Sequence, residues 1–142
     1  MKEHRSPRGW YRLLYPDHWT FEVEDDKNAM FFDPESGVGT LRISAIRAEG
    51  PGSFRAADEI VEAHGRKHNG AWVSLAKTRA VYYVDESTEE GEKVVSHHWV
   101  LGKGQLILAC TLALPAAPSS PNKAREELNL ALKVIESVVF ES

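Results

Sequence analysis

Residues 92–114 read Glu-Lys-Val-Val-Ser-His-His-Trp-Val-Leu-Gly-Lys-Gly-Gln-Leu-Ile-Leu-Ala-Cys-Thr-Leu-Ala-Leu. Two arms rich in apolar and β-branched residues flank the short loop Gly102-Lys103-Gly104, which is typical of an antiparallel hairpin. The second arm carries no charge, and apolar residues occupy both of its alternating sides. Such a strand has no face suited to water, so we expect a layer of structure on each side of the sheet.

Five further segments have strand composition and are separated by tight turns or by a helical pattern. They are residues 9–15, 19–24, 29–33, 40–46 and 75–85. The first four follow one another through short turns, which predicts an antiparallel meander. Residues 86–91, Glu-Ser-Thr-Glu-Glu-Gly, then predict an acidic hairpin tip that leads into the central hairpin.

Two segments carry apolar residues at helical spacing, Ser53–His68 and Pro121–Val139. Ser53 is a suitable N-cap for the first, and Ser120 followed by proline is a strong start for the second. The strands and helices are segregated along the chain rather than alternating. We therefore predict an α+β fold, a three-layer α/β/α sandwich with a central, mainly antiparallel sheet of about six or seven strands.

The length of 142 residues suits one domain, which we place at residues 9–142 after a flexible N-terminus at residues 1–8. The single cysteine, Cys110, excludes an intrachain disulfide and favours a reducing compartment. The polar N-terminus is not followed by the apolar segment of a secretory signal, and no apolar run is long enough to span a bilayer. A net charge of −4, with lysine and arginine scattered, argues against nucleic-acid binding. We expect a cytoplasmic protein that binds neither membrane nor nucleic acid.

Several local patterns together resemble the Mog1/PsbP-like fold. They are Tyr15-Pro16-Asp17-His18-Trp19, a Pro34 turn before Leu41-Arg42-Ile43-Ser44, the strand carrying Trp99, and the terminal Ile135-Glu136-Ser137-Val138. That group includes a Ran-binding nuclear-transport factor, a thylakoid lumenal subunit of photosystem II and small bacterial proteins without an assigned activity. The resemblance implies a compact antiparallel sheet between helices that binds other proteins without catalysis. No functional residue of the eukaryotic members matches a position here, so their partners are not transferred.

His64 and His68 form a candidate metal-binding pair, because residues four apart on a helix share a face. A third ligand is not visible, and Gly65 stands where a His-Glu-x-x-His motif needs glutamate. The competing interpretation is a histidine at the edge of the core followed by a helix-terminal charge. We therefore predict no metal and no cofactor.

His97 and His98 are adjacent in a strand, so their rings point to opposite faces of the sheet. One of them could meet Ser96, Asp85 or His18 across the sheet, an arrangement suited to acid/base chemistry. The stronger interpretation places His97 beneath a helix as a hydrogen-bonded residue. Cys110 lies among leucines, which predicts an inert thiol rather than a nucleophile. We predict no catalytic residue.

Two groups of residues are candidates for partner binding. Alternation does not assign Trp10, Tyr11 and Trp72 to the core, so together they could form an exposed aromatic patch. Glu86, Glu89, Glu90 and Glu92 gather at the acidic hairpin tip, where they could dock a basic partner. Core packing is the alternative for the aromatic residues, and solvation of a hairpin end is the alternative for the glutamates.

The function that we predict is that of a non-enzymatic protein-binding module, an adaptor or an immunity-type protein that masks a basic active site. The alternative is a small-molecule or metal-binding protein with a pocket between sheet and helix near His64, His97 or His98. Neither the partner nor the oligomeric state follows from the sequence.

Overall fold

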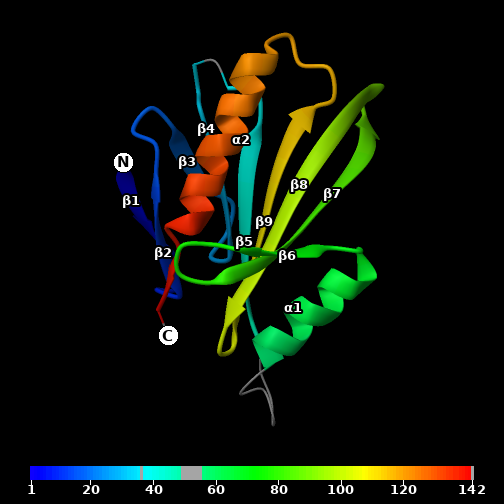
Figure 1. The fold of residues 1–142 in the computed structure, drawn as a ribbon. Coiled ribbons are helices and arrows are strands. Elements are labelled where there is room, and N and C mark those ends of the chain that lie inside the picture. The colour runs from blue at the N-terminus through cyan, green and yellow to red at the C-terminus, as the bar shows by residue number, and fades with distance from the viewer. Residues whose placement is uncertain (36, 49–55, 142) are drawn as a thin grey trace.

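The computed structural model describes residues 1–35, 37–48 and 56–141, in which two helices and ten strands are found (Figure 1). In chain order they are β1 (Lys2–Arg5), β2 (Tyr11–Tyr15), β3 (Thr20–Val23), β4 (Asn28–Phe32), β5 (Thr40–Arg47), α1 (Ala56–Lys67), β6 (Ala71–Ser74), β7 (Arg79–Glu89), β8 (Glu92–Lys103), β9 (Leu106–Pro115), α2 (Pro121–Glu136) and β10 (Val139–Phe140).

The larger sheet has seven antiparallel strands in the order β3-β4-β5-β9-β8-β7-β6. The predicted hairpin of β8 and β9 lies in its interior, with pairing that runs from Val94–Pro115 to Lys103–Leu106. On its other side, β9 pairs with the whole length of β5. The uncharged strand is therefore internal to the sheet, as its composition predicts.

A second sheet has three strands in the order β1-β2-β10, and both ends of the chain lie beside it (Figure 1). The predicted four-strand meander is therefore wrong in its first member, because β2 pairs with β1 and β10 rather than with β3. The expectation of a flexible terminus at residues 1–8 is also corrected. Lys2–Arg5 pair with Arg12–Tyr15, and His4 is buried against the rings of Phe21 and Phe31.

The main core lies between one face of the large sheet and a layer made by α2 and the three-stranded sheet. One complete side of β9 is buried, and all of it except Leu106 belongs to this core. None of the residues on this side is more than 6% exposed: Leu106, Leu108, Cys110, Leu112 and Leu114. Burial raises the pKa of the Cys110 thiol to about 12. Because the thiolate is the reactive form, this agrees with the inert cysteine that we predicted. Tyr11, Leu13 and Tyr15 of β2 complete the core.

The opposite face of the sheet is covered by α1. Ala57 and Val61 of the helix form a smaller cluster with three strand residues, Val81, Val100 and Ile107. Helices thus lie on both sides of the sheet, and the predicted α+β sandwich is confirmed. The cover is incomplete, however, because the same side of β9 beyond Ile107 carries only half-buried residues, Ala109, Thr111 and Ala113.

Helix α1 ends at Lys67, one residue before its predicted end, and α2 is shorter than predicted. α1 is described from Ala56, so the predicted cap Ser53 lies outside the described residues. α2 starts as expected, with the Ser120 side chain accepting a hydrogen bond from the Lys123 amide, but it ends at Glu136 rather than at residue 139. Ser137 is the C-cap of the helix. Its hydroxyl oxygen accepts a hydrogen bond from the Leu14 amide, which ties the end of α2 to β2. Neither helix in the described residues is long and apolar enough to cross a membrane.

Candidate functional site

The part of the sheet that α1 leaves uncovered is the candidate site, and we call it the open face. Residues that alternate toward this side on β5, β8 and β9 make up its surface: Thr40, Arg42, Ser96, His98, Ala109, Thr111 and Ala113. All seven are half-buried or exposed. Small and polar side chains replace the leucines of the core face, so the open face is built to meet solvent or a ligand rather than a helix.

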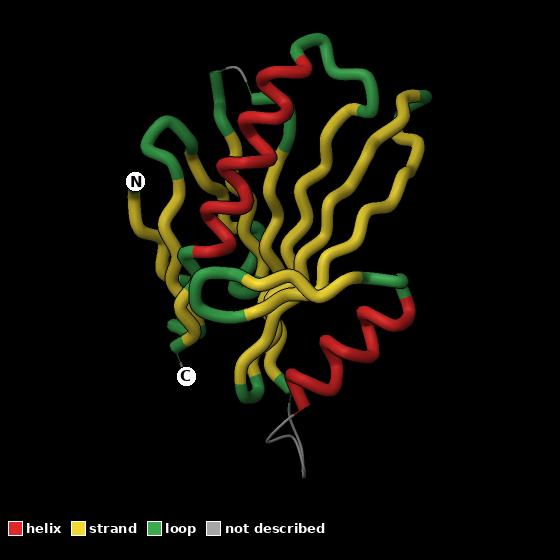
Figure 2. The backbone as a smooth tube through the Cα atoms, in the orientation of Figure 1, coloured by secondary structure: helices red, strands yellow, loops and turns green. Residues whose placement is uncertain are grey.

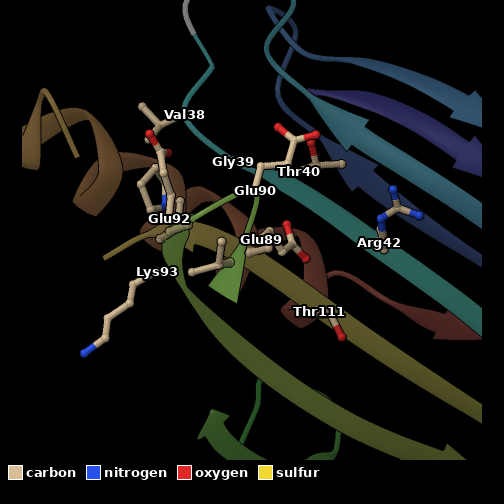
Figure 3. Close-up of a pocket in the computed structure, with 13 residues that line it drawn as sticks. Val38, Gly39, Thr40, Arg42, Glu89, Glu90, Glu92, Lys93 and Thr111 are labelled. Carbon is tan, nitrogen blue, oxygen red and sulfur yellow. The ribbon is translucent and has the colours of Figure 1, made fainter. Parts of the chain in front are cut away.

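A groove of about 700 Å³ lies at the far end of the open face, between the β7–β8 hairpin and the start of β5 (Figure 3). Thr111 and Ala113 line it from β9, Arg42 from β5 and Glu89 from the hairpin. Lys93 also borders the groove, but Figure 3 shows its side chain extending away. The groove therefore combines one arginine with several carboxylates.

A buried glutamate holds the β5 side of the groove in place. Glu127 of α2 is 1% exposed, and its carboxylate accepts hydrogen bonds from the Val38 amide at 2.6 Å and the Gly39 amide at 3.2 Å. A Cβ atom at Gly39 would lie only 2.6 Å from the Ala113 carbonyl oxygen, so glycine is needed for this close approach. Helix α2 thus fixes the residues that lead into β5, and these residues line the groove.

The other side of the groove is the end of the β7–β8 hairpin. Residues 85–92, which we call the acidic arm, carry five acidic side chains and no basic one. They are exposed, and Glu89 lies directly opposite Glu92 across the ladder. Glu90 and Gly91 connect the strands with φ angles of 52° and 82°, as in a type I′ turn. Of the four glutamates that we predicted as partner-binding residues, Glu89, Glu90 and Glu92 line the groove together, whereas Glu86 lies farther along β7 and does not line it.

Histidine rings and a tyrosine lie where α1 meets the open face. His68 and His98 each stack on the Tyr83 ring. Their ring centroids lie 4.4 Å and 4.5 Å, respectively, from the centroid of the tyrosine ring. His64 Nε2 lies 2.7 Å from the Tyr83 hydroxyl. Burial, followed by the charges of His68 and other neighbours, lowers the pKa of His64, so the contact is made by a neutral ring near pH 7.

His98 also joins a hydrogen-bonded chain on the open face. Its Nε2 lies 3.1 Å from Asp85 Oδ1 and its Nδ1 lies 3.0 Å from Thr111 Oγ1. Since an ionised carboxylate only accepts, Nε2 donates to Asp85, and Nδ1 shares a hydrogen bond with the threonine hydroxyl. Ser96, Asp85 and His18 were the predicted candidates for contact with His97 or His98, and Asp85 is the one that contacts His98. The chain orients the ring at the base of the acidic arm.

His97 points to the other face, as predicted from strand alternation. Its Nδ1 lies 2.7 Å from the Tyr82 hydroxyl, and burial lowers its pKa. Tyr82 and Trp99 line a hollow of about 280 Å³ beside Leu128 and Leu132 of α2. His97 is therefore a hydrogen-bonded residue on the α2 side of the sheet, and it is separated by the sheet from His98.

The three aromatic candidates do not form one patch. Tyr11 is 2% exposed and belongs to the core, so its assignment to a binding surface is wrong. Trp10 precedes β2 and is half-buried, with the Arg8 guanidinium 5.3 Å from its ring. Trp72 lies on the edge strand β6, is 41% exposed and carries Arg79 over its ring at 3.9 Å.

The paired histidines are close but incomplete as a metal site. The rings of His64 and His68 have centroids 4.4 Å apart, yet His64 Nε2 is engaged by Tyr83. Within residues 1–35, 37–48 and 56–141, no group of three or more His, Cys, Asp or Glu side chains has the geometry to hold a metal ion. The residues that the sequence pattern did not single out are Arg42 and Thr111, because only the strand pairing brings them beside the acidic arm.

Comparison with solved structures supports the fold. A protein from Bacteroides thetaiotaomicron aligns with 99% of this chain at 22% identity and a TM-score of 0.73; the chain spans only 48% of that protein. A Pseudomonas aeruginosa protein of unknown function, PA94, described as a putative regulator, aligns over 100% of this chain and 98% of its own at 17% identity and a TM-score of 0.55. At these identities the likeness is one of fold alone, and it agrees with the fold that the sequence resemblance implies.

A Mog1 point mutant aligns over 98% of this chain and 95% of its own, at 9% identity and a TM-score of 0.49. No protein with a curated function matches the chain. A family model for a domain of unknown function matches residues 1–139. The chain belongs to this family, DUF3805.

Proposed function

We propose that this domain is a non-enzymatic protein-binding module whose acidic arm and adjoining groove receive a basic segment of another protein. The observation that carries the proposal is the concentration of five carboxylates in residues 85–92, three of which, Glu89, Glu90 and Glu92, line an open groove of about 700 Å³. The surface has the charge and the accessibility that a basic partner needs.

The pairing of Glu89 with Glu92 supports an external partner. Like charges directly opposite one another in an antiparallel ladder destabilise it, and no basic residue lies between positions 85 and 92 to neutralise them. Solvation of a hairpin end does not need two glutamates at opposed positions. A cationic segment bound across the arm would relieve the repulsion, so the opposed glutamates favour binding of a basic partner.

An adaptor or an immunity-type protein would use such a surface in the same way. An adaptor would hold a basic segment of one partner, whereas an immunity-type protein would cover the basic active site of a toxin. The expected compartment for either is the cytoplasm, where Cys110 would remain reduced. Both roles predict a stoichiometric complex that salt weakens, because the contacts are made by exposed charges.

Affinity capture from the native host tests the proposal. The bait variant Glu86→Gln, Glu89→Gln, Glu90→Gln and Glu92→Gln removes four charges from the arm. A control bait with Glu22→Gln, Asp58→Asn, Glu59→Gln and Glu126→Gln removes the same charge from exposed positions elsewhere. We expect one stoichiometric partner with the wild type and the control, and its loss with the arm variant. Equal capture by both variants, or capture of nothing specific by the wild type, would refute the proposal.

A second candidate function is small-molecule binding, and the hollow beside Tyr82 and Trp99 favours it. That hollow measures about 280 Å³, and apolar side chains form much of its lining. Titration with Zn²⁺ and with an apolar dye, followed by tryptophan emission, checks this alternative. A saturable change that the variant Leu132→Trp abolishes would support it, because the larger side chain would fill the hollow. An unchanged spectrum would reject it.

A further inference from the structure

One edge of the large sheet is unpaired over most of β7. Strand β6 pairs only with Arg79–Tyr82 at the start of β7. From residue 83 to residue 89, β7 pairs with β8 on one side, and the described residues supply no strand on the other. Figure 2 shows this part of the β7 edge running beyond β6 without a neighbour. A bare strand edge offers main-chain donors and acceptors to another chain.

The turn of the hairpin shows which residues offer those groups. In a two-residue type I′ hairpin the residues that flank the turn, here Glu89 and Glu92, form a hydrogen-bonded pair. Since hydrogen-bonding direction alternates along a strand, Val84, Glu86 and Thr88 direct their N–H and C=O groups away from β8. Tyr82, two residues before Val84, directs its main-chain groups to the same side, and it pairs there with Ala71 of β6. The free edge thus continues the edge that β6 already uses.

We propose that a basic, extended segment of the partner protein adds to the large sheet as a further strand along residues 83–89 of β7. The inference rests on the proposed function and specifies how the partner is held. Main-chain hydrogen bonds would supply the alignment, and lysine or arginine side chains would meet the carboxylates of the acidic arm. The exposed side chain of Val84, 46% accessible, would add an apolar contact.

Charge selects this occupant over a second copy of the chain. Two antiparallel β7 edges that met around Glu86 would bring the glutamates of both copies together, and like charges at such positions oppose pairing. Asp85, Glu86 and Glu89 instead complement a cationic strand. Acidic residues on a strand edge also serve, in some proteins, only to keep that edge unpaired. The experiment below separates the two roles.

Two variants at one position isolate the edge hydrogen bond from the charge. Glu86→Pro and Glu86→Gln both remove the carboxylate, but only proline removes the outward N–H. Proline is tolerated on the free side of an edge strand, so the ladder with β8 is retained. We expect the proline variant to bind the probe about tenfold more weakly than the glutamine variant, since it loses one main-chain bond and its ring obstructs the neighbouring pairing.

The probes are two synthetic decapeptides of equal charge, one alternating lysine with threonine and the other alternating lysine with proline. Only the first can form a β-ladder, because the second lacks half of its amide donors. Binding is followed by NMR, with hydrogen exchange measured at each amide. We expect the lysine–threonine peptide to bind at least about tenfold more tightly than the lysine–proline peptide and to slow exchange at Val84, Glu86 and Thr88.

Three results would overturn the inference. Equal binding of the two peptides, protection of amides elsewhere than the β7 edge, or no binding at about 1 mM peptide would each exclude strand addition. The exchange measurement on the wild-type protein remains decisive if Glu86→Pro fails to fold. Should captured partner depend on the four glutamates while the edge shows no protection, the protein-binding function stands and only strand addition fails.

Discussion

The Glu127→Gln variant tests how the groove is held, because one buried carboxylate bonds two amides of its β5 side. The amide side chain keeps only one acceptor oxygen for the N–H groups of Val38 and Gly39, and its own NH2 group would face the second donor. A hydrogen bond to a charged acceptor contributes about 1.5–3 kcal/mol. We therefore expect the free energy of unfolding to fall by about 2 kcal/mol.

A domain of this kind has a stability of about 5–15 kcal/mol, so the variant should remain folded. Urea denaturation followed by tryptophan fluorescence measures the loss, since Trp19 and Trp99 are buried. The matched control is Glu126→Gln, one residue earlier on α2 and exposed, which should change stability by less than about 0.5 kcal/mol. Hydrogen exchange at Val38 and Gly39 should accelerate in the first variant alone. Equal stabilities for the two variants would refute the assigned role of Glu127.

Three further predictions concern stability. Glu92→Gln should raise the free energy of unfolding by less than about 1 kcal/mol, because it relieves repulsion by Glu89; a decrease on denaturation would contradict that pairing. Leu112→Ala should cost about 2–5 kcal/mol, whereas Thr111→Ala, on the open face, should cost less than about 1.5 kcal/mol; equal losses would mean that both sides of β9 are equally buried. Burial lowers the pKa of His4 below 6.5, so the unfolded state binds more protons than the folded state below this pH. The free energy of unfolding should therefore have its full value above pH 6.5 and decrease as the pH falls below 6.5. His4→Phe should flatten this part of a urea-denaturation pH series, and an unchanged slope would contradict the burial of a neutral ring.

Much of the fold could be predicted because periodicity reports directly on burial. The leucines of β9 alternate with smaller residues, and the central hairpin and the sandwich follow from that pattern. The elements that were missed have weak local signals. β1 is almost entirely polar, and it is held by pairing with β2 and by one buried side chain, His4. Val139 continues the apolar spacing of α2, so only the contact of Ser137 with Leu14 shows where the helix ends.

The candidate site was predictable only where sequence neighbours become spatial neighbours. The acidic arm is one hairpin, so its glutamates gather by chain connectivity alone. The open face could not be foreseen, because Ala109 and Ala113 have the composition of a buried strand and their exposure depends on where α1 ends its cover. Arg42 reaches the groove from β5, and no local pattern links that strand to the hairpin.

The most direct test of the account is a hydrogen–deuterium exchange footprint of the domain in complex with its captured partner. If the open face and the acidic arm form the contact surface, exchange should slow at residues 83–95 and 109–113. It should stay unchanged in α2 and in the three-stranded sheet. Protection confined to α2 or to β1, β2 and β10 would place the partner on the opposite side of the molecule and contradict the account.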